Sequence, residues 1–163
     1  MNVASIKDFD VNNGEGIRVS LWVSGCPHHC KNCHNPESWN PNFGVSFEKK
    51  HLDKIIKLLR KDINKDFSIL GGEPLVDYNI ENVTYICKTL KYIYPDLNIW
   101  IWTGYLYENI KDKEILKYID VLVDGKYIEE QKDLDLLWRG SANQRVIDVK
   151  ESLKQGKVIK YID

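Results

Sequence analysis

Short apolar segments typical of β-strands alternate with amphipathic helical patterns along most of this chain. The predicted strands, which are rich in β-branched and aromatic side chains, lie at residues 18–24, 67–70, 98–102, 121–123, 144–149 and 157–162. The predicted helices lie at residues 48–60, 80–92 and 107–118. Repeated alternation of strand and helix favours a mainly parallel sheet joined by helical crossovers, so we expect an α/β fold.

The composition describes an ordinary globular chain. With 163 residues and no internal repeat or linker-like tract, it is expected to form a single domain over residues 1–163. Charged residues make up 29% and the net charge is −1, which gives no indication of nucleic-acid or membrane binding. The amino terminus lacks a secretion signal, and no apolar run is long enough to span a bilayer. We therefore expect a cytoplasmic protein, where clustered cysteines more often hold metal or take part in catalysis than form disulfides.

Polar or glycine-rich residues follow the ends of four predicted strands. These segments are residues 25–34, 71–73, 103–105 and 124–126. In parallel α/β folds, ligands bind at the carboxyl ends of the strands. The four segments are therefore expected to meet at one edge of the sheet and to form one shared site.

The first of these segments holds three cysteines in the spacing CxxxCxxC, namely Cys26, Cys30 and Cys33. Three thiolates leave one position open on whatever metal centre they hold, and an open position can receive a substrate. Thiolates favour iron–sulfur clusters, so a cluster bound through three of its irons fits this motif best.

A structural zinc site is the alternative, with His28, His29 or His34 as the fourth ligand. Zinc-binding cysteines usually come as two separate pairs, whereas the fourth cysteine, Cys87, stands alone on a predicted helix. We expect Cys87 to be a small buried apolar residue. Trp100 and Trp102 alternate with isoleucines in a predicted strand, which favours core packing.

The residues around the cysteines resemble the radical S-adenosylmethionine (SAM) enzymes, and within them the activating proteins of anaerobic ribonucleotide reductase. The blocks that carry the resemblance are residues 11–18, 21–26, 33–39, 71–75, 99–105, 121–127 and 137–144. They occur in order over most of the chain, and the later blocks separate this family from other short radical SAM proteins.

This resemblance implies an incomplete parallel (β/α) barrel and an oxidoreductase whose chemistry resides in two cofactors, so no side chain is assigned as catalytic. It implies a 4Fe–4S cluster on Cys26, Cys30 and Cys33, with SAM on the open iron. Cleavage of SAM would then generate a glycyl radical on anaerobic ribonucleoside-triphosphate reductase. The implied partners are that reductase and a one-electron reductant such as a flavodoxin-type protein, and a homodimer is compatible with the family.

The resemblance also implies which residues bind SAM. They are Asn32, Cys33, His34, Gly71, Gly72, Glu73, Asp124 and Lys126. Glycines at a strand end permit close backbone approach, and a carbonyl or carboxylate of residues 71–73 can accept the SAM ammonium. Asn32 and His34 would line the pocket, and Asp124 and Lys126 would serve a cation site or the SAM carboxylate.

Other interpretations stay open at this point. Asn32 and His34 are equally compatible with a solvated loop, and Asp124 with a surface Asp-Gly turn. Residues 139–144 fit either contact with SAM or the partner, or a helix-breaking loop. The protein could also be a radical SAM enzyme acting on another glycyl-radical enzyme or on a small molecule, or a zinc-stabilised binding module.

Overall fold

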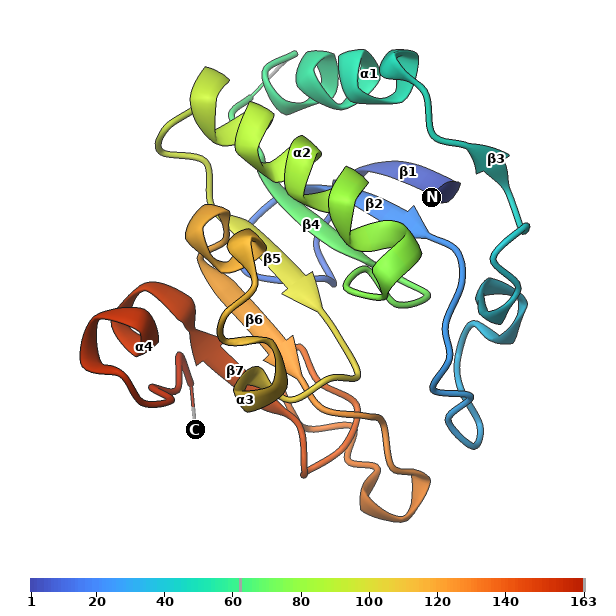
Figure 1. The fold of residues 1–163 in the computed structure, drawn as a ribbon, viewed down its shortest axis with the longest axis vertical. Coiled ribbons are helices and arrows are strands. Elements are labelled where there is room, and N and C mark those ends of the chain that lie inside the picture. The colour runs from blue at the N-terminus through green and yellow to red at the C-terminus, as the bar shows by residue number, and fades with distance from the viewer. Residues whose placement is uncertain (62, 163) are drawn as a thin grey trace.

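The computed structural model describes residues 1–61 and 63–162, and within them one open, mixed sheet of seven strands forms the centre of the molecule (Figure 1). The strands are β1 (Asn2–Asp10), β2 (Arg18–Val23), β3 (Val45–Ser46), β4 (Asp66–Gly71), β5 (Ile99–Trp102), β6 (Val121–Asp124) and β7 (Arg145–Asp148). Their order across the sheet is β3-β1-β2-β4-β5-β6-β7.

The centre of the sheet is parallel, as the alternating pattern predicted. Strands β2, β4, β5 and β6 run side by side in one direction, with Leu21 opposite Ile69 and Ile69 opposite Ile101. The outer strands β1, β3 and β7 are antiparallel to their neighbours, which makes the sheet mixed. The α/β class is therefore confirmed, and the expectation of a mainly parallel sheet holds only for its four central strands.

Strand β1 was not predicted from the sequence. It lies near the edge of the sheet, and most of its side chains are partly or fully exposed, so it lacks an apolar pattern. Its pairing with β2 shifts register twice, between Val3 and Ser5 and between Lys7 and Asp10. Phe9 has a positive φ of 54° at the second irregularity. Such bulges bend a strand and increase its twist.

The helices are α1 (Lys49–Leu59), α2 (Asp77–Ile93), α3 (Tyr107–Ile110) and α4 (Val149–Gln155), with short 3-10 turns η1 (Pro36–Trp39), η2 (Glu114–Tyr118) and η3 (Glu129–Gln131). The predicted helix over residues 107–118 is wrong as a single element. Lys113 adopts an extended conformation, so the chain forms α3 and then restarts as η2. Among the described residues, none of these helices is long and apolar enough to cross a membrane.

The predicted strand over residues 157–162 is also wrong. A short helix, α4, begins after Asp148, whose side chain accepts a hydrogen bond from the Glu151 N–H, and it ends at Gly156 in a left-handed conformation. The following chain only bridges β7, where the Asp148 N–H donates to the Ile159 carbonyl at 2.9 Å. The cap and the glycine are the signals that mark this helix.

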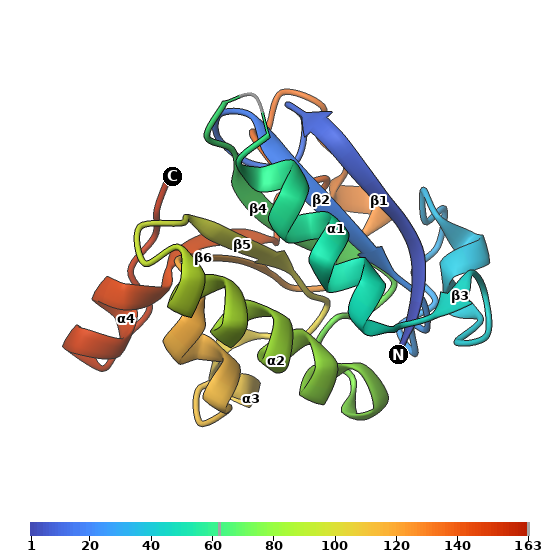
Figure 2. The same cartoon turned by 90° about the horizontal axis from the view of Figure 1, so that it is seen from above.

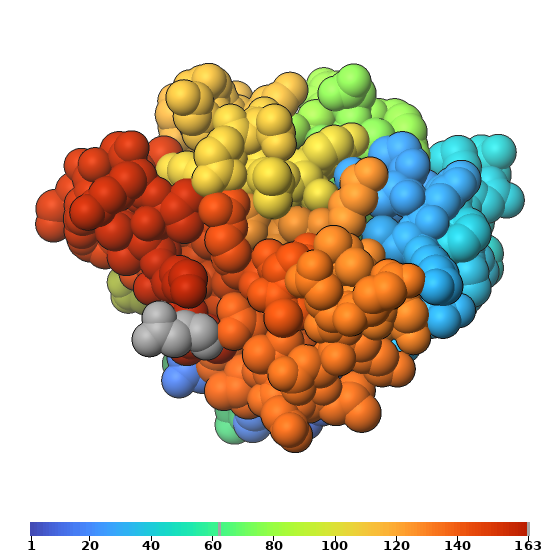
Figure 3. Space-filling view, turned by 90° about the horizontal axis from the view of Figure 1, so that it is seen from below, coloured from blue at the N-terminus to red at the C-terminus, as the bar shows by residue number. Residues whose placement is uncertain are grey.

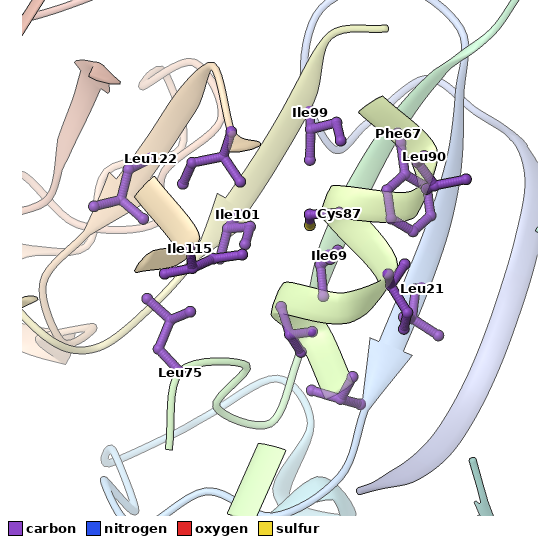
Figure 4. Packing of buried hydrophobic residues seen from close by; sticks show 14 of the residues in the cluster. Leu21, Phe67, Ile69, Leu75, Cys87, Leu90, Ile99, Ile101, Ile115 and Leu122 are labelled. Atoms are coloured by element: carbon purple, nitrogen blue, oxygen red, sulfur yellow. The ribbon is translucent and has the colours of Figure 1, made fainter. Parts of the chain in front are cut away.

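Helices α1 and α2 cover one face of the sheet (Figure 2). Alternate strand residues point into this layer, including Leu21, Ile69 and Ile101. Cys87 lies on α2 in the same cluster and is 0% exposed, which confirms it as a core residue (Figure 4). This face is mainly aliphatic, with Phe67 among its members, and supplies the main hydrophobic core.

The opposite face carries polar and aromatic side chains and is covered by loops. Trp100 is 0% exposed, with its ring centroid 4.9 Å from that of Trp138 and 5.3 Å from that of Tyr161, which confirms the prediction of core packing. Arg18, at the start of β2, is also fully buried there and donates to the Ser68 hydroxyl at 2.6 Å and to the Phe67 carbonyl at 2.7 Å.

Candidate metal and cofactor site

The segments that follow β2, β4, β5 and β6 meet at the carboxyl edge of the sheet, as predicted. The Glu73 N–H donates to the Gly25 carbonyl at 2.8 Å, and the Gly125 N–H donates to the Tyr105 carbonyl at 3.1 Å. Figure 3 shows this edge, where the segment after β6 (orange) lies beside the segment that follows β2 (blue). The parallel centre of the fold therefore builds one composite surface from four distant parts of the sequence.

The cysteine loop, defined here as residues 26–34, follows β2 and holds three free and partly exposed cysteines. Its first residue is anchored because the Cys26 N–H donates to the Trp39 carbonyl at 3.2 Å. A tight turn brings the Cys33 N–H to the Cys30 carbonyl at 3.1 Å, with Asn32 at a positive φ of 56°. The loop thus holds all three thiols on one short, turn-rich segment.

Burial makes two thiols of the loop, Cys26 and Cys30, harder to ionise. Burial raises the pKa of Cys26 to about 11, and burial also raises the pKa of Cys30, although the Tyr127 N–H opposes that shift. Because metals bind the thiolate, loading this site requires loss of these protons.

The donor set of the cysteine loop is three thiols, the ligand type that iron–sulfur clusters use. Within residues 1–61 and 63–162, no three His, Cys, Asp or Glu side chains are grouped as they would be around one metal ion. The candidate fourth zinc ligands have other neighbours, since His28 contacts Glu73 and the His29 ring stacks on Trp39 with centroids 4.7 Å apart. Three free thiols match a cluster that keeps one iron open.

The Gly71-Gly72-Glu73 turn packs directly against the backbone that leads into the cysteine loop. A Cβ atom on Gly72 would lie 2.6 Å from the Gly25 carbonyl oxygen, which is closer than such atoms come in proteins. Gly71 has a φ of +112°, a conformation that side chains rarely adopt. The close approach at these glycines is between two parts of the protein, and their predicted approach to a ligand stays a prediction.

The carboxylate of Glu73 is buried and fully engaged. Among the described residues, four groups donate to it: the Leu75 N–H at 2.9 Å and the Thr103 hydroxyl at 2.8 Å to Oε1, and the Gly104 N–H and His28 Nε2, each at 2.7 Å, to Oε2. The side chain of Glu73 is 1% exposed. The main-chain carbonyl of Glu73 is engaged as well, since it accepts a hydrogen bond from Asn79 Nδ2 at 3.0 Å.

Asp124 and Lys126 lie at the end of β6 but have different surroundings. Asp124 is fully buried, accepts from Arg145 Nε at 3.0 Å and accepts from the Tyr107 N–H at 2.8 Å. Arg145, which the sequence did not single out, also donates to Glu108 at 2.8 Å. Lys126 is exposed and close enough to Cys30 to lower that thiol's pKa, against the larger effect of burial.

Asn32 and His34 are exposed and face the segment that follows Lys126. The side chain of Asn32 hydrogen bonds to Glu129, and this bond and a stronger one from the Tyr127 hydroxyl lower the pKa of Glu129. The His34 ring centroid lies 6.2 Å from that of Tyr127. Tyr127 and Glu129 were not predicted as site residues, because only the folded chain brings them to the cysteine loop.

A cleft of about 590 Å³ opens beside the cysteine loop. Its walls include His28 from the loop, Tyr105 and Asn109 from the region after β5, and Lys126 and Asn143 from the region after β6. An aromatic ring, two amides and a cation therefore face one cavity next to the thiols, which is an arrangement suited to a polar, partly aromatic ligand.

Comparison with known proteins gives concordant matches. Residues 12–147 match the family model described as 4Fe-4S single cluster domain. The chain is similar to proteins named anaerobic ribonucleoside-triphosphate reductase-activating protein from Haemophilus influenzae (43% identical over 148 residues, 88% of this chain and 96% of the relative) and Enterobacteria phage T4 (40% over 146 residues, 90% and 93%). The protein of that name from Escherichia coli K12 is 38% identical over 150 residues, covering 90% of this chain and 97% of the relative.

Proposed function

Because this chain belongs to the family of anaerobic ribonucleoside-triphosphate reductase-activating proteins, which contain a 4Fe–4S single cluster domain, we propose that it is a radical SAM activase. In this proposal it cleaves SAM reductively and generates a glycyl radical on anaerobic ribonucleoside-triphosphate reductase. With this reaction the protein would be an oxidoreductase. The observation that carries the proposal is the placement of three free thiols on a loop beside a cleft at the carboxyl edge of the sheet, with Lys126 on the cleft wall.

Cys26, Cys30 and Cys33 are proposed as the cluster ligands. A 4Fe–4S cluster held by these three cysteines would supply the electron for cleavage of a carbon–sulfur bond of SAM, and that cleavage would enable removal of a hydrogen atom from the reductase glycine. The chain holds the three thiols on one loop and anchors that loop at the Cys26 N–H. A flavodoxin-type protein is the proposed source of the electron.

The cleft is proposed as the SAM site. Lys126 is exposed on its wall, near Cys30, so its ammonium is placed to bind the SAM carboxylate. Main-chain carbonyls of Gly71 and Gly72 are proposed to accept the SAM ammonium, since both the carboxylate and the carbonyl of Glu73 already accept hydrogen bonds. Asn32 and His34 flank Cys33 and are proposed to line the adenosine end.

Asp124 is proposed to stabilise this site from the protein interior, without contacting SAM. Its carboxylate holds Arg145 and the first turn of α3, so it fixes the segment that carries Lys126. The open sheet is proposed to be the incomplete barrel expected for radical SAM proteins, with its uncovered edge admitting a glycine-bearing loop of the reductase. The free cysteines suit the reducing cytoplasm.

Anaerobic preparation of the whole chain tests the proposal. We expect a brown protein with about four irons and four sulfides per chain. On reduction it should cleave SAM, and a glycyl-radical signal should appear in electron paramagnetic resonance (EPR) spectra only when the reductase is present. A colourless protein with one zinc per chain would contradict the cluster, and a radical on another protein but not on the reductase would contradict the proposed substrate.

A further inference from the structure

One contact joins the Glu73 carboxylate to the cysteine loop. Three of the four donors to this carboxylate come from the turns after β4 and β5, and the fourth is His28 Nε2 at 2.7 Å. Among the described residues, His28 is the loop side chain that hydrogen bonds to Glu73. It stands two residues after Cys26 and two before Cys30, so its position constrains both thiols.

The contact is shielded from water. The side chain of His28 is 7% exposed and that of Glu73 is 1% exposed. Hydrogen bonds to a buried carboxylate are stronger than those on the surface, and removing one donor leaves a buried acceptor without a partner. The His28–Glu73 bond is therefore a firm attachment of the loop, unlike the exposed pair of Lys31 with Glu130.

The ring of His28 packs closely against the two residues Gly104 and Tyr105. A Cβ atom added to Gly104 would come within 2.3 Å of His28 Cδ2, so a glycine is needed beneath the ring. On another side the Tyr105 ring meets it edge-on, with centroids 4.8 Å apart. Both residues follow β5, so the turn after β5 holds the imidazole in place while Glu73 holds its Nε2 atom.

We propose that Glu73 is a positioning residue, which holds the cysteine loop through His28 and makes no contact with SAM through its carboxylate. This rests on the proposed function in taking Cys26, Cys30 and Cys33 as the cluster ligands. Both carboxylate oxygens already accept two hydrogen bonds, which leaves no acceptor position for an ammonium group. The glutamate of the Gly-Gly-Glu turn would then act on the cluster ligands through His28 and the cysteine loop.

His28→Phe tests the attachment, because it keeps a ring and removes the N–H donor. Outer-shell partners of metal ligands typically change metal affinity by about ten- to a hundred-fold. We expect this variant to lose its cluster to an iron chelator about ten-fold faster than the unmodified protein, with a shifted EPR spectrum of the reduced cluster. His28→Gln, whose amide can donate to Glu73, should recover much of the difference.

Thr103→Val is the matched control. It removes another of the four hydrogen bonds to the same carboxylate, at 2.8 Å, but leaves the cysteine loop attached. We expect it to lower the unfolding midpoint while its cluster lifetime and EPR spectrum stay as in the unmodified chain. Gly104→Ala offers a second route, since it keeps His28 and Glu73 but displaces the ring, and it should behave like His28→Phe.

Glu73→Gln separates positioning from ligand binding. If the carboxylate positions the loop, Glu73→Gln and His28→Phe should shorten cluster lifetime alike, and the double variant should be no worse than either. A normal cluster lifetime with weakened SAM binding in Glu73→Gln, or an unaltered cluster in His28→Phe, would overturn the proposal. Failure of the unmodified protein to assemble any cluster would instead overturn the proposed function.

Discussion

Two buried charged residues lie at opposite edges of the sheet, Glu73 at the carboxyl edge and Arg18 at the amino edge. Both residues are fully buried, and both are surrounded by hydrogen-bond partners. The partners of Glu73 come from three segments of the candidate site, whereas Arg18 binds the hydroxyl of Ser68 and backbone carbonyls. A buried charge is therefore no indicator of function by itself. The segments that it joins decide what its loss will affect.

The largest effect is expected at the thiols. Cys26→Ala should abolish assembly of the iron–sulfur cluster, because three protein ligands are the fewest that hold a cluster with one open iron. Iron and sulfide analysis of anaerobically prepared protein measures this directly. Full iron content in Cys26→Ala would contradict the assignment of the metal site to the carboxyl edge of the sheet.

Removal of the charge at the amino edge should damage folding and leave the site intact. Arg18→Met is expected to lower the free energy of unfolding by about 3 kcal/mol, because the carbonyls of Phe67 and Asn98 and the Ser68 hydroxyl lose buried donors. Denaturant titration measures the loss. The iron bound per folded chain should stay unchanged. A selective loss of iron in Arg18→Met would show that the amino edge, like the carboxyl edge, supports the metal site.

A smaller effect is expected from the fourth cysteine. Cys87→Ala removes one sulfur from the aliphatic layer between α2 and the sheet, where the residue is fully buried. We expect a loss of about 1 kcal/mol in unfolding free energy and an unchanged iron content. Loss of the cluster in this variant would show that Cys87, and not only the cysteine loop, supports the metal site.

The smallest effect is expected from the exposed ion pair between the cysteine loop and η3. Lys31 and Glu130 are 2.8 Å apart, but their side chains are 70% and 66% exposed. Lys31→Ala should leave the unfolding midpoint unchanged within error, since solvent and salt screen such pairs. The same substitution should also leave cluster lifetime unaltered, in contrast to His28→Phe. A shortened lifetime would mean that surface charges help to hold the loop.

Much of the fold followed from local sequence patterns, and the rest depended on tertiary context. The parallel centre, the buried Cys87 and the buried Trp100 were predictable because periodicity and β-branched content report on burial. Strand β1 was not, because its half-exposed residues carry no such pattern. Helix α4 was also missed, although Asp148 and Gly156 mark its two ends.

The site was predictable to the level of segments but not of side-chain partners. Strand ends in a parallel sheet converge, so the meeting of the cysteine loop with the Gly71-Gly72-Glu73 turn followed from topology. The His28–Glu73 contact did not, because its partners are 45 residues apart. A histidine between cysteines is also as typical of a metal ligand as of a hydrogen-bond donor to a carboxylate. The same limit applies to Arg145 beside Asp124.

The irregular edge of β1 also bears on association between molecules. A free sheet edge can pair with another chain and begin aggregation. Strand β3 pairs with the outer side of β1 at Asn2 and Val3. Along the rest of β1, the bends at its two register shifts against β2, the positive φ of Phe9 and the exposed charge of Lys7 interrupt the regular array of N–H and carbonyl groups. Extension of the sheet across β1 into a neighbouring molecule is disfavoured, so the fold protects this edge from intermolecular strand pairing.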